Sequence, residues 1–252
     1  MTLNNIEEIA AFIVADGKGI LAADESNPTC GKRFDSIGVE STEKNRRDYR
    51  EMLFRSKGMK GNIGGVILFD ETIRQSAADG TLLRDLILDQ GALPGIKVDK
   101  GLQPIDECPG ETITVGLDGL DERLKEYASM GAKFTKWRAV INIGDGTPTD
   151  KCIDANMEAL ADYAKCAQEN GMVPIVEPEV LMDGEHSIDE CCEATDRSLR
   201  SLFMHLIHKG VNIKGTLLKP NMVTSGKDAS VQAGIDEVAK KTLDCLIANV
   251  PV

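Results

Sequence analysis

The sequence predicts an α/β fold in one domain, residues 1–252, built as a parallel β/α barrel with only about six βα units. Short apolar runs rich in β-branched residues alternate with longer segments of helical period. The runs start at residues 19, 64, 95, 134, 173 and 215, so the units are 31 to 45 residues long and 252 residues hold six of them, not eight. This regularity favours a barrel, although the same spacing also fits an open doubly wound sheet.

The predicted strands are almost continuously apolar, which is typical of parallel strands that are covered on both faces. They are Gly19–Asp24, Gly64–Phe69, Gly95–Lys100, Phe134–Ile141, Val173–Pro178 and Gly215–Pro220.

Apolar stripes with helical spacing predict the helices. The predicted helices are an amphipathic one near Ile6–Ile13, one from Leu120 that ends before Gly131, one around Ile153–Ala164 that ends before Gly171, one that opens at the capping-box pattern Ser187–Glu190 and ends at Gly210, and a last one around Ile235–Ile247.

Composition excludes several classes of function. The chain carries 29 Lys and Arg against 41 Asp and Glu, a net charge of −12, and it has no basic run. This disfavours nucleic acids and anionic membranes as partners, but a small anionic substrate needs only a local group of cations. No run reaches the roughly 18 apolar residues of a membrane span.

Cysteine usage and the first residues predict a cytoplasmic protein. The seven cysteines are odd in number and form no CxxC pair, as expected for reduced thiols. The beginning of the chain has no signal-peptide or transit-peptide pattern. His205 and His208 lie three residues apart on a predicted helix, but without a third ligand nearby they are more often ordinary histidines than metal ligands. We therefore expect no metal.

Charge inside the predicted strands is the most informative feature, because charged side chains are almost never buried without partners. One lysine at a strand end is usually solvated, but charges on five strands favour a shared polar site at the carboxyl ends of a parallel barrel. The eight residues are Asp24, Lys97, Asp99, Lys136, Arg138, Glu177, Glu179 and Lys219.

Lysine and carboxylate together suit carbonyl chemistry. A lysine amine becomes a nucleophile when it loses its proton, and burial or a neighbouring cation favours that loss. Lys136 is expected to act in this way on Lys219, while Glu177 or Glu179 moves protons as a carbonyl substrate condenses with the amine.

The remaining cations, such as Lys97 and Arg138, suit phosphate. The chain has no GxGxxG fingerprint, no GxxxxGK[ST] loop and no plausible Ser-His-Asp arrangement, so no nucleotide cofactor is indicated. The residues alone predict a Schiff-base enzyme that acts on a phosphorylated carbonyl compound.

Six segments, in family order and covering nearly the whole chain, closely resemble class I fructose-bisphosphate aldolases: GKGILAADES (Gly17–Ser26), GGVILFDET (Gly64–Thr72), GIKVDKG (Gly95–Gly101), KWR (Lys136–Arg138), VPIVEPEVL (Val173–Leu181) and GTLLKPNMV (Gly215–Val223). The resemblance implies a TIM (β/α)8-type barrel and a glycolytic, cytoplasmic lyase that needs neither metal nor cofactor. It would cleave fructose 1,6-bisphosphate reversibly to dihydroxyacetone phosphate and glyceraldehyde 3-phosphate. Family members are usually homotetramers, so a complete chain is expected to form one.

The resemblance also implies catalytic roles. Lys219 would form the Schiff base, and Glu177 would be the general acid and base of carbinolamine formation and dehydration. Glu179 would order the lysine cluster. Asp24 would assist proton transfer and carbon–carbon cleavage, and Lys136 would tune Lys219.

Substrate-binding roles follow in the same way. Lys97 would face the distal phosphate, Arg138 would bind substrate, and Arg33 matches a phosphate contact of the family. Arg46 is a weaker candidate for that last role.

Two departures from the family pattern bear on these expectations. Where the family often has Thr-Gly-Ser after ADES, this chain has Asn27-Pro28-Thr29, so only the Thr29 hydroxyl is left for phosphate. The family sequence also continues beyond the position of Val252 with two more barrel strands, a Ser-Gly-Gly phosphate loop, another arginine and a tail that ends in tyrosine. The alternative expectation is therefore a truncated aldolase without turnover of its own, which at most binds sugar phosphates or needs a complementing partner.

Overall fold

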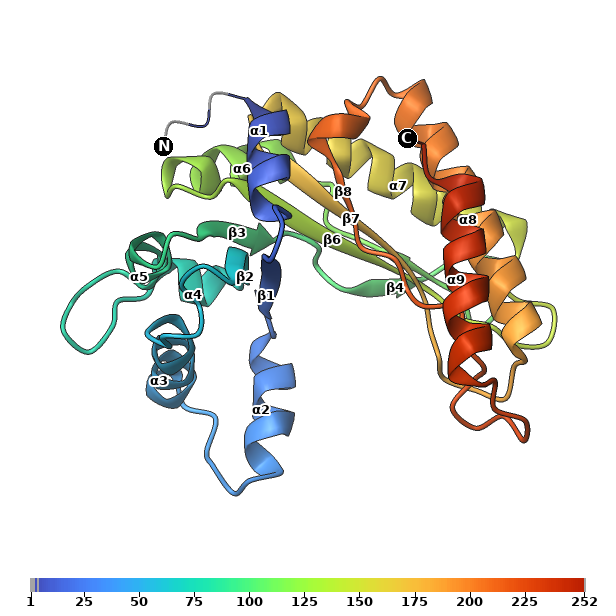
Figure 1. Cartoon of the computed structure of the whole chain (residues 1–252), viewed down its shortest axis with the longest axis horizontal. Helices are drawn as coiled ribbons and strands as arrows, with labels where there is room; N and C mark the ends of the chain where they lie inside the picture. Colours follow the sequence, from blue (N-terminus) through green and yellow to red (C-terminus); the bar gives the residue numbers. More distant parts are fainter. Residues whose placement is uncertain (1–2, 4, 252) are drawn as a thin grey trace.

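Six parallel strands form a half-barrel in the computed structural model, which describes residue 3 and residues 5–251 (Figure 1). Along the sheet they follow the order β1 (Gly19–Ala23), β2 (Ile63–Leu68), β3 (Leu93–Lys97), β6 (Phe134–Ile141), β7 (Val173–Val180) and β8 (Leu217–Leu218). The predicted α/β fold and its six βα units are confirmed. In the described part of the chain, β1 pairs only with β2 and β8 only with β7, so the half-barrel has two open edges.

Several predicted strand ends were wrong. β3 ends at Lys97, so Asp99 lies in the loop that follows it, whereas β7 continues to Val180 and contains Glu179. The last strand is only two residues long, because a 3-10 turn, η1 (Ile213–Gly215), occupies its predicted start. The Asn212 side chain caps that turn by accepting hydrogen bonds from two of its amides. Lys219 therefore follows a strand end directly.

The helices expected from apolar stripes are all present: α1 (Ile6–Ile13), α6 (Leu120–Ser129), α7 (Asp150–Glu169), α8 (Ile188–His208) and α9 (Ile235–Asn249). Four further helices and one hairpin are present that the sequence pattern did not predict, namely α2 (Asn27–Asp35), α3 (Glu43–Phe54), α4 (Asp70–Arg74), α5 (Leu83–Asp89) and the antiparallel pair β4 (Leu102–Pro104) and β5 (Thr112–Thr114). In the described part of the chain, no helix is both long and apolar enough to cross a membrane.

The outer layer of the protein consists of helices packed on the sheet and on each other. α7 packs against β6, β7 and α8, and α9 lies beside α8 (Figure 1). Trp137 of β6 stacks on Tyr163 of α7 with 5.4 Å between ring centroids. The Tyr163 hydroxyl lies 2.7 Å from the Thr135 hydroxyl and donates to the carbonyl of Ile175 at 3.2 Å, so this buried polar group is satisfied.

The inner face of the sheet has its own apolar cluster, which α1 covers. Ile9 and Ile13 of α1 pack with Ile67, Phe134 and other lumen-facing residues. Glycine makes room for this packing, since a Cβ at Gly95 would lie 2.3 Å from the Phe134 ring. Gly95 of β3 is therefore required by close packing.

Candidate active site

The half-barrel lumen changes from apolar to charged along its strands. On β6, Phe134 belongs to the apolar cluster, and Lys136, two residues later on the same face, is bonded to carboxylates. On β7, Ile175 belongs to the cluster and Glu177 follows two residues later. Because side chains alternate along a strand, one strand contributes to both the cluster and the charged region.

Glu177 is the centre of the charged region. Its carboxylate is 2% exposed and forms ion pairs with two lysines. Oε1 is paired with Nζ of Lys219, and Oε2 lies 2.9 Å from Nζ of Lys136. Lys136 also donates to Oδ2 of Asp24 at 3.2 Å. One network thus joins four residues from different strands: Lys136 within β6, Glu177 within β7, Asp24 directly after β1 and Lys219 directly after β8.

Lys136 and Lys219 differ in burial. Burial by itself would lower the pKa of Lys136, but the carboxylates of Asp24 and Glu177 outweigh it, so this pKa is raised above its usual value. Lys136 therefore remains an ammonium group at neutral pH. The Lys219 side chain is 50% exposed, whereas that of Lys136 is 10% exposed.

Glu179 and Arg138 form a second pair one step further along the strands. The Arg138 guanidinium donates to the Glu179 carboxylate, and both side chains are partly exposed. In the described part of the chain, the ion pair of Glu179 is with this arginine and not with a lysine of the network. Any ordering of the lysines by Glu179 is therefore indirect.

Lys97 lies beside an open cleft next to the network. Its Nζ is paired with Oδ1 of Asp99, whose side chain is 6% exposed. The cleft has a volume of about 660 Å³, and its lining includes Ser26, Lys100 and Arg123 as well as Lys97 and Asp99. A cation beside a cleft of this size can reach a small anionic ligand.

Arg33 and Arg46 lie on the helices that follow β1, and the structure separates their roles. The Arg33 side chain is 61% exposed and is paired with Glu25. Arg46 is buried, and two of its nitrogens donate to Glu71 at 2.8 and 2.6 Å. Because its donors are used within the protein, Arg46 is poorly placed to bind phosphate.

Sequence reasoning missed Arg50, a second buried arginine on α3. The low apolar content of α3 concealed its buried face, which carries Arg46, Arg50 and Phe54 at intervals of four residues. That interval is the signal that could have revealed it, because residues four apart share a helix face and Phe54 indicates that this face is buried.

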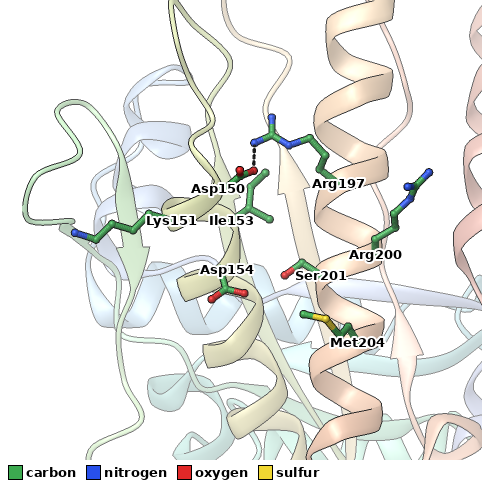
Figure 2. A pocket seen from close by; sticks show the side chains of 8 residues that line it. All are labelled: Asp150, Lys151, Ile153, Asp154, Arg197, Arg200, Ser201 and Met204. Carbon is green, nitrogen blue, oxygen red and sulfur yellow. Dashed lines mark hydrogen bonds and ion pairs between the residues drawn. The ribbon is translucent and has the colours of Figure 1, made fainter.

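Another cavity lies away from the network, between α7 and α8. Figure 2 shows Arg197 pointing at Asp150, and Met204 and Ser201 lining the lower part of the cavity. Nη2 of Arg197 lies 2.7 Å from Oδ1 of Asp150. Its volume is about 520 Å³, and none of the predicted site residues lines it. It is an outer groove between helices.

Histidine and cysteine give no metal site in the described residues, which contain no group of three or more His, Cys, Asp or Glu side chains suited to hold a metal ion. Nε2 of His205 lies 2.8 Å from Oδ1 of Asp154. The absence of a metal requirement stays a prediction.

Together, the fold and the site define a β/α-barrel protein with paired lysines and carboxylates in its lumen, beyond the apolar cluster that α1 covers. Residues 5–252 match the family model described as fructose-bisphosphate aldolase class-I, and the chain belongs to this family.

Relatives with curated names agree with this assignment. The chain is 53% identical over 251 residues to the probable fructose-bisphosphate aldolase class 1 of Xanthomonas campestris pv. campestris, a match that covers 100% of this chain and 75% of the relative. It is 50% identical over 242 residues to the cytosolic fructose-bisphosphate aldolase 4 of Arabidopsis thaliana, covering 96% of this chain and 62% of that protein.

A solved structure supports the fold. The chain superposes with a TM-score of 0.96 and 46% identity on fructose-bisphosphate aldolase from Plasmodium falciparum, which was crystallised with TRAP and a small-molecule inhibitor. The match covers 98% of this chain and 72% of that one.

Proposed function

We propose that this chain is a class I fructose-bisphosphate aldolase in activity as well as in family. In this proposal Nζ of Lys219 forms a Schiff base with the C2 carbonyl of fructose 1,6-bisphosphate, and the sugar is cleaved reversibly to dihydroxyacetone phosphate and glyceraldehyde 3-phosphate. The observation that carries the proposal is the buried carboxylate of Glu177, which contacts the amines of both Lys219 and Lys136.

Glu177 is suited to the first half of the reaction. It takes a proton from Lys219, whose neutral amine attacks C2, and it returns a proton to the C2 oxygen so that water can leave and the iminium can form. Lys136 remains charged and shares the Glu177 carboxylate with Lys219.

Asp24 is suited to the second half. Cleavage of the C3–C4 bond sends its electron pair to the iminium, which becomes an enamine, and the C4 hydroxyl must lose its proton as the aldehyde forms. We assign the acceptance of this proton to Asp24, whose Oδ2 is held 3.2 Å from Nζ of Lys136. Protonation and hydrolysis of the enamine then release dihydroxyacetone phosphate and restore Lys219.

Three cations are proposed to bind the sugar phosphate: Arg33, Lys97 and Arg138. Each is paired with a carboxylate that a phosphate group would have to displace, namely Glu25, Asp99 and Glu179 respectively. Arg33 and Arg138 are more than a third exposed, so this exchange needs no unfolding. A phosphate gains paired hydrogen bonds from the arginine fork.

Steady-state cleavage of fructose 1,6-bisphosphate tests the proposal. The purified chain should produce both triose phosphates, and borohydride together with dihydroxyacetone phosphate should inactivate it irreversibly. Borohydride alone is the matched control and should leave the activity in place. A folded chain that neither cleaves the sugar nor is inactivated would refute the proposal.

A second candidate function is binding without turnover, or activity only with a complementing partner. It is favoured by the edges of β1 and β8 that have no strand partner among the described residues, and a cavity of about 340 Å³ is lined by residues of both strands, including Ile20, Leu217 and the adjacent Lys219. Titration calorimetry with dihydroxyacetone phosphate separates the two functions. Binding without cleavage supports the second, and cleavage at ordinary enzymatic rates rejects it.

We also propose a cytoplasmic location and a homo-oligomer, with a tetramer expected by family resemblance for a complete chain. The cytosolic names of two Arabidopsis relatives support the location, although a relative from Chlamydomonas reinhardtii is named chloroplastic. Cell fractionation tests the location, and light scattering during size-exclusion chromatography tests the assembly.

A further inference from the structure

Arg50 holds the main chain on both sides of Asp24. Its side chain is 1% exposed and reaches from α3 to the end of β1. Nε donates to the carbonyl of Ala23 at 3.2 Å, and Nη2 donates to the carbonyl of Glu25 at 3.0 Å. One planar guanidinium therefore fixes the residues before and after Asp24.

The buried charge of Arg50 is balanced locally. Nη2 also lies 3.1 Å from Oε2 of Glu25, and Nη1 donates to Sγ of Cys30 at 3.5 Å. The other oxygen of Glu25 is paired with Arg33. A fully buried guanidinium is tolerated when it is paired and hydrogen-bonded in this way, and it is costly otherwise.

Asp24 needs such support because it lies just beyond regular structure. β1 ends at Ala23 and α2 begins at Asn27, so within the part of the chain that the structure describes no strand pairing fixes the carbonyl of Glu25. The Asp24 side chain is hydrogen-bonded to Lys136, whereas the main-chain carbonyls of its two neighbours, Ala23 and Glu25, are hydrogen-bonded to Arg50. Without Arg50, the carbonyl of the buried residue Ala23 loses this donor.

Arg46 shows that burial on the same helix face does not by itself bring an arginine into contact with the residues beside Asp24. It lies one turn earlier on α3 and is also buried, but its donors go to Glu71 and to the carbonyl of Ser41. Arg46 thus joins α3 to α4, whereas Arg50 joins α3 to the segment that carries Asp24.

We infer that Arg50 is a positioning residue that sets the place of Asp24 in the carbon–carbon cleavage step. This inference rests on the proposed aldolase function. Displacing a reacting group by about 1 Å can cost 10²-fold in rate. A loss of this kind should appear in the cleavage step and leave Schiff-base formation at Lys219 largely intact.

Arg50→Lys is the direct test, because it keeps the positive charge and loses the planar fork. We expect kcat for fructose 1,6-bisphosphate cleavage to fall by about 10- to 100-fold, with KM changed by less than about threefold. The rate of borohydride trapping with dihydroxyacetone phosphate should stay within about twofold of wild type. Arg84→Lys is the matched control, since Arg84 also donates to a carbonyl, that of Ile73, away from Asp24.

Hydrogen exchange of the 19–26 segment gives a readout that does not depend on activity. Arg50→Lys should exchange at least about tenfold faster there, and Arg84→Lys should match wild type. Unchanged exchange and unchanged kcat in folded Arg50→Lys would overturn the inference. If wild type lacks turnover and trapping, the proposed function fails, while the exchange result still decides whether Arg50 orders this segment.

Glu25→Gln covers the case in which Arg50→Lys does not fold. It removes the charge partner and keeps both carbonyl contacts, so we expect a smaller fall in kcat, about threefold to tenfold, and faster exchange of the same segment. A folded Glu25→Gln variant with wild-type kcat and wild-type exchange would count against the inference.

Discussion

The two ends of the half-barrel lumen are built from the same strands but differ in chemistry. The end covered by α1 is apolar, with Phe134, Ile67 and Ile175 fully or almost fully buried. The opposite end carries the network centred on Glu177 and Lys136. The difference shows that one strand can contribute to stability with its first lumen-facing residue and to chemistry with a later one, in line with the placement of active sites in parallel barrels.

On β7, only two residues separate a side chain that packs in the apolar cluster from one that belongs to the charged network. Val173 and Ile175 belong to the apolar cluster, and Glu177 and Glu179 follow on the same face. The charges are tolerated because each is paired with a cation on β6 or directly after β8. Variants of the two ends should therefore separate activity from stability, and the largest effect is expected at Lys219.

Lys219→Ala should reduce kcat for fructose 1,6-bisphosphate cleavage by about 10⁴-fold or more, because the proposed nucleophile is lost. Stability should change little, since this side chain is half exposed and Glu177 keeps Lys136 as a partner. Cleavage assays and urea unfolding measure the two effects. A variant that unfolds at much lower urea but keeps its turnover would contradict the division of the lumen.

Phe134→Ala should have the reverse effect. Removal of a fully buried phenylalanine side chain costs about 3–5 kcal/mol of unfolding free energy. The kcat of the folded fraction should stay within about threefold of wild type, because the ring contacts the cluster and not the network. Urea unfolding together with cleavage assays at low temperature measures both effects. A variant that is stable but inactive would contradict the assignment of stability to the apolar end and of activity to the charged end.

Glu177→Gln should lower kcat by about 10²- to 10³-fold, because the amide keeps the shape of the carboxylate but cannot move protons. Glu111→Gln is a matched control, since Glu111 is also buried but bonds Thr149, away from the network. Equal losses of kcat in both variants would show that burial, and not proton transfer, explains the effect.

The smallest predicted effect is on stability at high pH. The folded state raises the pKa of Lys136, so the stabilisation from its charged form is fully present below the unfolded pKa of about 10.4 and is lost as pH rises through the folded pKa. Unfolding free energies measured between about pH 9 and pH 12 should fall more steeply for wild type than for Lys136→Met. Parallel curves would show that Lys136 contributes nothing to this dependence.

The sequence predicted the six strands and most of the network, because apolar runs and charges inside them are local patterns. It did not predict that Glu177 joins two lysines, since register between strands decides which side chains meet: Arg138 is the backbone partner of Glu177, yet Lys136 makes the contact. It also missed Arg50, whose role depends on a contact between α3 and residues 25 positions earlier.

Peptide mapping after borohydride reduction with dihydroxyacetone phosphate tests the central claim most directly, namely that the charged end of the lumen carries out Schiff-base chemistry. Mass spectrometry of the digested protein should find the reduced three-carbon adduct on Lys219. Modification of Lys136 or Lys97 in place of Lys219, or no adduct on a folded chain, would contradict the account.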